Sequence, residues 1–226
     1  MLKGTHLIRL ENISILNNTN KEVLKDINLF LPSGSVISIN SSRSCGKTRL
    51  MQTIGLIERP KSGNLYLLGK NIKRLNKSEL SEIHREIGIV FEENNFIKNF
   101  NIESNIIFPL ILKKERLKDI EQALKELLPW LNLETVVKKY TWQLSNAELK
   151  LAQFARAIIG RPRILLLDNF FMHIEKSMYK KINYLLLALN KIGTTIIIFG
   201  DIPKDNSFKF NKIYFISNKQ LLEING

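Results

Sequence analysis

Short apolar strands that alternate with helical segments are the feature that most limits what this chain can fold into. Four segments of five or six residues have the composition of buried strands, at residues 35–40, 87–91, 164–168 and 194–199. Apolar residues at helical spacing follow the first strand and separate the last two. A strand that is apolar on both faces has to be covered on both faces, which is typical of parallel sheets. The sequence therefore predicts an α/β fold whose parallel sheet is covered by helices.

Both ends of the chain predict antiparallel structure. Residues Leu7–Ser14 and Glu22–Leu31 alternate apolar and polar side chains, and the turn-rich residues Asn17–Asn20 separate them. Such alternation is typical of half-buried strands, so we expect an antiparallel β portion at the N-terminus. At the other end, residues 212–217 and 220–224 predict a closing hairpin.

From about residue 92 to residue 160 the pattern changes to helices, predicted over residues 102–112, 117–128 and 146–159. Their apolar faces predict packing within a helical lobe, and we expect Trp130 and Trp142 to be core or interface aromatic residues. We therefore expect a single domain over residues 1–226. Its core comprises residues 1–91 and 161–226, and the helical lobe of about residues 92–160 is inserted between them.

Composition narrows the possible partners and compartments. Lys and Arg number 34 against 21 Asp and Glu, and the net charge of +13 attracts polyanions. Since we find no helix-turn-helix, zinc-finger or aromatic RNA-binding signature, we expect no specific nucleic-acid partner.

The apolar runs are far shorter than the roughly 18 residues of a membrane span, and the N-terminus carries no apolar signal sequence. One cysteine, Cys45, cannot form an internal disulfide, so we expect a cytoplasmic protein.

A phosphate-binding loop is predicted where the strand over residues 35–40 meets the helix that begins at Lys47. In the pattern G-x-x-x-x-G-K-[ST], backbone N–H groups cradle phosphates, the lysine reaches the β- and γ-phosphates, and the hydroxyl binds Mg²⁺. Gly46, Lys47 and Thr48 match, whereas Ser41 replaces the first glycine, where we expect a tight turn. We therefore expect ATP and Mg²⁺ as cofactors. The predicted nucleotide-binding residues are Ser41, Ser42, Arg43, Ser44, Cys45 (a small filler), Gly46, Lys47, Thr48, Arg49 and Asn17.

A carboxylate at the end of a buried strand predicts a second part of this site. Residues Ile164–Leu167 form an apolar run that ends at Asp168. A carboxylate placed in this way can hold Mg²⁺ through water. We therefore predict that Asp168 acts together with Thr48.

The order of these motifs resembles an ATP-binding-cassette (ABC) transporter ATPase, a P-loop NTPase, from about residue 7 to residue 224. The resemblance is carried by the phosphate loop, residues 87–92, 144–148 and 155–157, Asp168, and residues 195–201. The phrases at residues 57–63, 126–133 and 189–195 resemble the cell-division ATP-binding proteins FtsE most, and the lipoprotein-release ATPases LolD second.

The resemblance assigns roles to further positions, several of which depart from the family pattern. Asn17 stands where an aromatic residue stacks on adenine, and a lost stack of about 1–3 kcal/mol would weaken nucleotide binding. Glu92 replaces the Q-loop glutamine and joins Thr48 and Asp168 as an expected metal-binding residue. The signature motif, which closes over the partner's ATP, reads Leu144, Ser145, Asn146, Ala147 and Glu148.

Two catalytic positions are also changed. Asn169 stands at the position of the catalytic glutamate, and Gly200 stands at that of the switch histidine. An asparagine cannot accept a proton at neutral pH, and losing a general base costs on the order of 10²–10⁴ in rate. We expect His173 to be a solvent-facing or core residue that does not replace them. The sequence therefore predicts weak or absent ATP hydrolysis.

The resemblance to FtsE implies a complex with an integral membrane subunit like FtsX that acts in cell division. We expect a homodimer held on the cytoplasmic face of the plasma membrane. A lipoprotein-release or other ABC transporter subunit, a non-catalytic ABC scaffold, and an ABC protein acting on nucleic acid are the alternatives. The expected docking groove is built from Phe91 to Ile107, where apolar residues are dense at Phe96, Ile97, Phe100 and Ile102; the alternative is that all four are core residues of the lobe.

Overall fold

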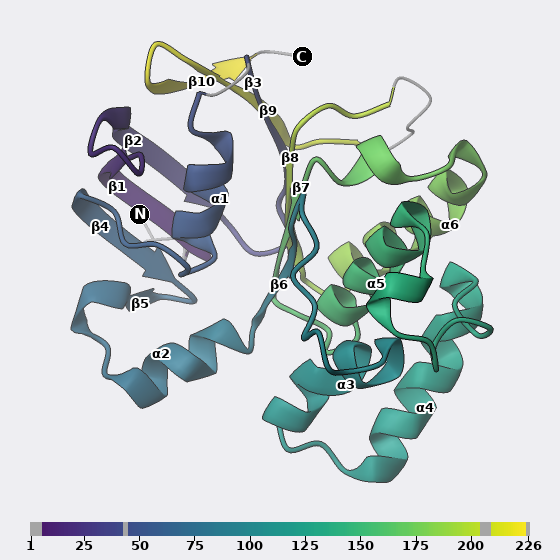
Figure 1. The fold of residues 1–226 in the computed structure, drawn as a ribbon. Helices are drawn as coiled ribbons and strands as arrows, with labels where there is room; N and C mark the ends of the chain where they lie inside the picture. Colours follow the sequence, from purple (N-terminus) through teal and green to yellow (C-terminus); the bar gives the residue numbers. More distant parts are fainter. Residues whose placement is uncertain (1–5, 43–44, 204–208, 225–226) are drawn as a thin grey trace.

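The computed structural model describes residues 6–42, 45–203 and 209–224. An antiparallel sheet with the strand order β2-β1-β4-β5 forms one side of the protein (Figure 1). Its strands are β1 (Ile8–Leu16), β2 (Glu22–Leu31), β4 (Ser62–Leu67) and β5 (Lys70–Asn71). The alternating side chains of β1 explain its position, because Ile8, Leu10 and Ile13 are fully buried.

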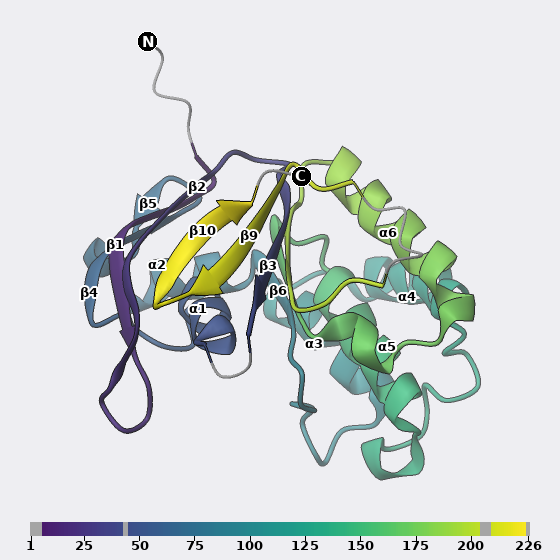
Figure 2. The same cartoon turned by 90° about the horizontal axis from the view of Figure 1, so that it is seen from above.

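The second sheet runs through the centre of the protein, and its order within the described residues is β10-β9-β3-β8-β7-β6. Neighbouring strands are parallel except for the antiparallel pair β9–β10. The strands are β3 (Val36–Ser41), β6 (Ile87–Val90), β7 (Ile164–Asp168), β8 (Thr195–Phe199), β9 (Lys212–Ser217) and β10 (Gln220–Ile224). Figure 2 shows the β9–β10 hairpin next to β3. The predicted fold class is confirmed: a parallel sheet with an antiparallel N-terminal part and a helical lobe.

The fully apolar central strands divide their side chains between two cores. Leu166 and Ile197 point to a core that they share with α1 (Lys47–Ile54) and the antiparallel sheet. Leu165 and Leu167 point to the opposite face, which the helical lobe and α6 (Tyr179–Lys191) cover. This alternation explains why the strands are apolar at every position.

The helical lobe contains α3 (Ile102–Leu112), α4 (Leu117–Leu127) and α5 (Asn146–Ile158) and lies to one side of the parallel sheet (Figure 1). Helix α2 (Lys77–His84) precedes β6. Short 3₁₀ turns cover Ile72–Arg74, Leu128–Leu131, Thr141–Gln143, Phe170–His173 and Lys176–Met178. None of the described helices combines the length and the apolar composition of a membrane span. The division into core and lobe at residues 92 and 160 stays a prediction.

Both tryptophans lie at the surface, so a core position for them is ruled out. Trp130 is 41% exposed and Trp142 is 71% exposed. Each stacks on a tyrosine, Trp130 on Tyr184 and Trp142 on Tyr140, with ring centres 4.8 Å and 4.6 Å apart. An aromatic residue in an otherwise helical segment does not reveal from sequence which face it occupies.

Candidate functional site

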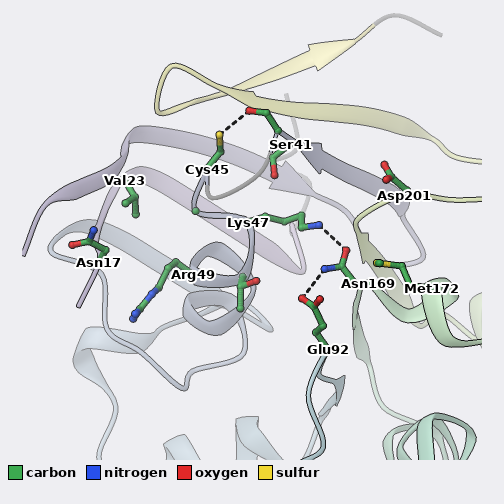
Figure 3. Close-up of a pocket in the computed structure, with 13 residues that line it drawn as sticks. Asn17, Val23, Ser41, Cys45, Lys47, Arg49, Glu92, Asn169, Met172 and Asp201 are labelled. Carbon is green, nitrogen blue, oxygen red and sulfur yellow. Dashed lines mark hydrogen bonds between the residues drawn. The ribbon is translucent and has the colours of Figure 1, made fainter. Parts of the chain in front are cut away.

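A cavity of about 800 Å³ opens where β3 and β7 end and α1 begins (Figure 3). The carboxyl edge of a parallel sheet is the usual position of a ligand site in α/β proteins. The residues that line the cavity come from parts of the chain that are far apart in sequence. They are Asn17, Val23, Ser41, Ser42, Cys45, Gly46, Lys47, Thr48, Arg49, Glu92, Asn169, Met172 and Asp201.

Gly46 makes the turn from the loop into α1. Its φ angle is +89°, in the left-handed region that favours glycine. A β-carbon at this position would lie only 3.1 Å from Leu24 Cγ. Gly46 has no side chain that could cap the first turn of α1, and that turn contains no acidic residue. This helix start is therefore suited to an anion, and the phosphate-binding role that the loop pattern predicts for it stays a prediction.

Ser41 differs from its prediction, because the chain does not turn there. It is the last residue of β3 and pairs with Ile216 of β9. The strand therefore continues one residue further than expected, and the conformation that needs a glycine lies at Gly46. Ser41 and Ser42 line the cavity, and the Ser42 hydroxyl lies 2.9 Å from Cys45 Sγ. Arg43 and Ser44 were also predicted here and lie outside the described residues.

Thr48 and Asp168 meet at the floor of the site, and this pair fits a magnesium ion. The Thr48 hydroxyl donates a hydrogen bond to Asp168 Oδ2 at 3.2 Å. Asp168 is 1% exposed, and its Oδ1 finds no hydrogen-bond partner among the described residues. Burial raises the pKa of Asp168, while nearby Lys47 lowers it. A buried carboxylate oxygen without a partner costs free energy that a cation would recover, and Mg²⁺ prefers oxygen ligands.

Lys47, Asn169 and Glu92 form a chain of hydrogen bonds across the cavity (Figure 3). Lys47 Nζ donates to Asn169 Oδ1 at 2.7 Å, and Asn169 Nδ2 donates to Glu92 Oε2 at 2.7 Å. The amide therefore uses both of its ends, as an acceptor for the ammonium and as a donor to the carboxylate. Asn169 takes a left-handed conformation with φ +44°, which asparagine tolerates better than most residues. Glu92, predicted as a metal-binding residue, thus contacts Asn169 directly.

Gly200 lies directly behind Asn169. A β-carbon at Gly200 would lie 2.1 Å from Asn169 Oδ1 and 3.1 Å from Lys47 Nζ. No side chain fits at residue 200 while Asn169 binds Lys47. Residues 169 and 200, the two positions where the sequence predicts changed catalytic residues, are therefore sterically linked.

The far end of the cavity is polar. Asn17 Oδ1 accepts hydrogen bonds from the Lys21 N–H at 2.9 Å and from Thr19, so Asn17 stabilises the turn between β1 and β2. The Arg49 guanidinium binds the side chains of Asn18 and Glu58. Both predicted residues line the cavity.

The signature segment forms the start of α5, outside the cavity. Ser145 caps the helix and exchanges hydrogen bonds with Glu148. These bonds lower the pKa of the Glu148 carboxyl. Leu144 packs against the core of the lobe, and Asn146 and Ala147 form the first turn of α5. Glu148 therefore has a helix-capping role in this structure.

Sequence reasoning missed Val23, Met172 and Asp201, which line the cavity. Asp201 could have been found, because it follows the carboxyl end of β8, where ligand sites gather. Met172 lies one turn beyond Asn169, and Val23 reaches the site from β2. His173 is exposed, which is one of the two positions expected for it, solvent-facing or core.

Of the four side chains expected to line a docking groove, Ile97 lines a cavity in the structure. This cavity of about 340 Å³ lies beside α3 and β6 and is also lined by Phe108 and Pro109. The docking role stays a prediction. Ile102 is fully buried in the core of the lobe. Phe96 packs partly against that core. An aromatic residue in a loop can turn towards either face, and the local sequence does not decide which.

Fold and site together define a P-loop nucleotide-binding domain. The loop turns at Gly46 into a helix that begins with Lys47, and the Thr48 hydroxyl pairs with Asp168 at the end of β7. The chain belongs to the ABC transporter family, whose family model matches residues 24–171.

The matching proteins refine this assignment. The chain is 30% identical over 198 residues to the methionine import ATP-binding protein MetN of Corynebacterium jeikeium, covering 86% of this chain and 54% of that protein. It is 32% identical over 178 residues to MetN 1 of Burkholderia orbicola, covering 78% and 52%. The chain thus spans about half the length of these curated relatives. It also resembles the dimeric ATP-binding cassette MJ0796 bound to ADP and Pi, with a TM-score of 0.87, 25% identity, and coverage of 97% of this chain and 99% of that one.

Proposed function

We propose that this chain is the ATP-binding subunit of an ABC membrane complex that binds MgATP and hydrolyses it weakly or not at all. One observation carries the proposal: the phosphate loop keeps Lys47 and the Thr48–Asp168 pair, while the next residue, Asn169, is an amide bonded to Lys47. The groups that would bind MgATP are therefore retained, while the side chain at residue 169 is an amide that cannot accept a proton.

The residues of the site suit this role as follows. The N–H groups at the start of α1 and the Lys47 ammonium would hold the phosphates. Thr48 and Asp168 would hold Mg²⁺, with Glu92 as the third group of the site, and the bound ion would neutralise phosphate charge. Asn17 offers an amide in place of an aromatic ring, so binding of the base is weaker than in the family pattern.

Calorimetry with MgATP tests this proposal. We expect weak but measurable binding to the wild type and a loss on Lys47→Ala of roughly 1.5–3 kcal/mol, or about 10- to 150-fold. Phosphate release should stay close to background. Equal affinities of the two proteins, or no binding by either at millimolar ATP, contradict nucleotide binding; fast phosphate release contradicts the weak hydrolysis.

For the partner, we propose an integral membrane subunit docked in the groove beside α3, and a homodimer of this chain. Ile97, Phe108 and Pro109 supply apolar surface in that groove. Membrane attachment would then be peripheral, on the cytoplasmic face of the plasma membrane. The dimeric cassette in the similar structure supports a homodimer.

Two classes of membrane subunit are distinguishable. The relatives named as methionine import proteins favour an importer's membrane subunit. The phrases at residues 57–63, 126–133 and 189–195 favour an FtsX-like subunit. Co-expression with a candidate of each class, followed by co-purification in detergent, decides between them; retention of neither contradicts both classes of partner.

A further inference from the structure

Helix α5 binds the loop over residues 91–96, here called the Glu92 loop, through a buried lysine. Lys150 Nζ donates hydrogen bonds to the carbonyl oxygens of Phe91 and Glu92, each at 2.6 Å. Lys150 is 2% exposed, and burial lowers the pKa of its ammonium. A buried ammonium is costly unless hydrogen bonds compensate it, so these two carbonyl groups are strongly held.

Two further side chains on α5 continue the same contact, at intervals of three residues. Gln153, which is fully buried, donates from Nε2 to the carbonyl of Glu93 at 3.0 Å. Arg156 donates from Nη1 to the carbonyl of Asn95 at 3.1 Å, and its guanidinium lies 4.9 Å from the centre of the Phe96 ring. Residues three apart lie along one side of a helix, so α5 follows the Glu92 loop step by step.

The side chain of Glu92 leads from this loop into the cavity. It accepts the 2.7 Å hydrogen bond from Asn169, which in turn binds Lys47 of the phosphate loop. A continuous path of polar contacts therefore runs from the backbone-binding face of α5 to the lysine of the phosphate loop. Each contact along this path joins residues that are distant in sequence.

We propose that Lys150, Gln153 and Arg156 are positioning residues that attach the Glu92 loop to α5 and thereby hold the Glu92 carboxylate on Asn169. This positioning concerns the nucleotide-free protein and does not depend on the proposed nucleotide binding.

The side-chain amide of Asn169 reports the position of Glu92 directly. Protein labelled with ¹⁵N-asparagine is compared by NMR in the nucleotide-free state as wild type, Lys150→Met and Glu92→Ala, with Asn169→Ala to assign the signal. We expect Lys150→Met to move the Asn169 signal most of the way to its position in Glu92→Ala. The matched control is Lys113→Met, because Lys113 also donates to a backbone carbonyl, that of Gly160 at 3.0 Å, but not in the Glu92 loop.

An unmoved Asn169 signal in folded Lys150→Met, with a moved signal in Glu92→Ala, overturns the positioning role. Should Lys150→Met fail to fold, Gln153→Ala replaces it; the signal is expected to move in the same direction, and an unmoved signal again overturns the proposal.

Discussion

The hydrogen bond between Lys47 and Asn169 engages the lysine that a phosphate would need, so we expect its loss to strengthen nucleotide binding. Removing the amide by Asn169→Ala should tighten MgATP binding. The bond is 2.7 Å long and involves a charged donor, for which about 1.5–3 kcal/mol is typical in a buried setting. Lys47 is only partly buried and water replaces part of the bond, so we expect about 1 kcal/mol, or roughly fivefold in Kd.

The assay is calorimetry with MgATP at saturating Mg²⁺ and fixed ionic strength, because salt screens phosphate contacts. The double variant Lys47→Ala/Asn169→Ala should bind MgATP no more tightly than Lys47→Ala, since the lysine that Asn169→Ala would release is then absent. Asn132→Ala is the matched control and should leave the Kd unchanged, because Asn132 also accepts a hydrogen bond from a lysine, Lys181 at 2.8 Å, but lies outside the cavity. Weaker binding by Asn169→Ala, or a tightening that persists without Lys47, would refute the reasoning.

Three further predictions follow from the same geometry. Because burial raises the pKa of Asp168, the folded chain holds its proton more tightly than the unfolded chain, and stability falls as pH rises between the two pKa values. Asp168→Asn should therefore weaken the dependence of stability on pH. At neutral pH it should raise the Tm of the nucleotide-free protein by about 2–4 °C for each kcal/mol gained in the free energy of unfolding. An unchanged Tm in thermal unfolding contradicts the argument. Asn169→Glu alone should leave phosphate release near background, because Gly200 still offers no side chain towards a phosphate; a gain of about 100-fold or more would contradict this. Ile97→Asp should reduce co-purification with a membrane subunit while the Tm stays nearly unchanged, since Ile97 lines the groove beside Phe108; retained binding would place the docking site elsewhere.

Local sequence patterns predicted most helices and strands correctly. The predicted bounds of β2 (Glu22–Leu31) and α3 (Ile102–Leu112) agree with the structure, and α5 differs by one residue at its end. These elements depend on side chains that repeat at the strand or helix period, so the information is contained in neighbouring residues. The same holds for the phosphate loop, whose chemistry follows from three consecutive residues, 46–48.

The direction of single side chains was less predictable. Trp130 and Trp142 lie at the surface and Ile102 lies in the core of the lobe, which are positions that the sequence had left open. Ser41 continues a strand where a turn was expected, because β9 lies beside β3 and extends the pairing to Ile216. For Ser41 and Ile102, packing against distant segments determined the position of the backbone or the side chain.

The sequence by itself therefore determined most of the elements and the fold class, which depend on short-range patterns, and it predicts the residues of the phosphate loop. Only the tertiary structure decided the strand order and which polar groups meet. Lys47, Asn169 and Glu92 are separated by up to 122 residues, yet they are joined by hydrogen bonds. Hydrogen bonds need donor and acceptor atoms within about 3 Å of each other, and that precision comes from the packing of α1 and α5 on the central sheet. The carbonyl groups that compensate the buried ammonium of Lys150 are likewise brought to it only in the folded chain.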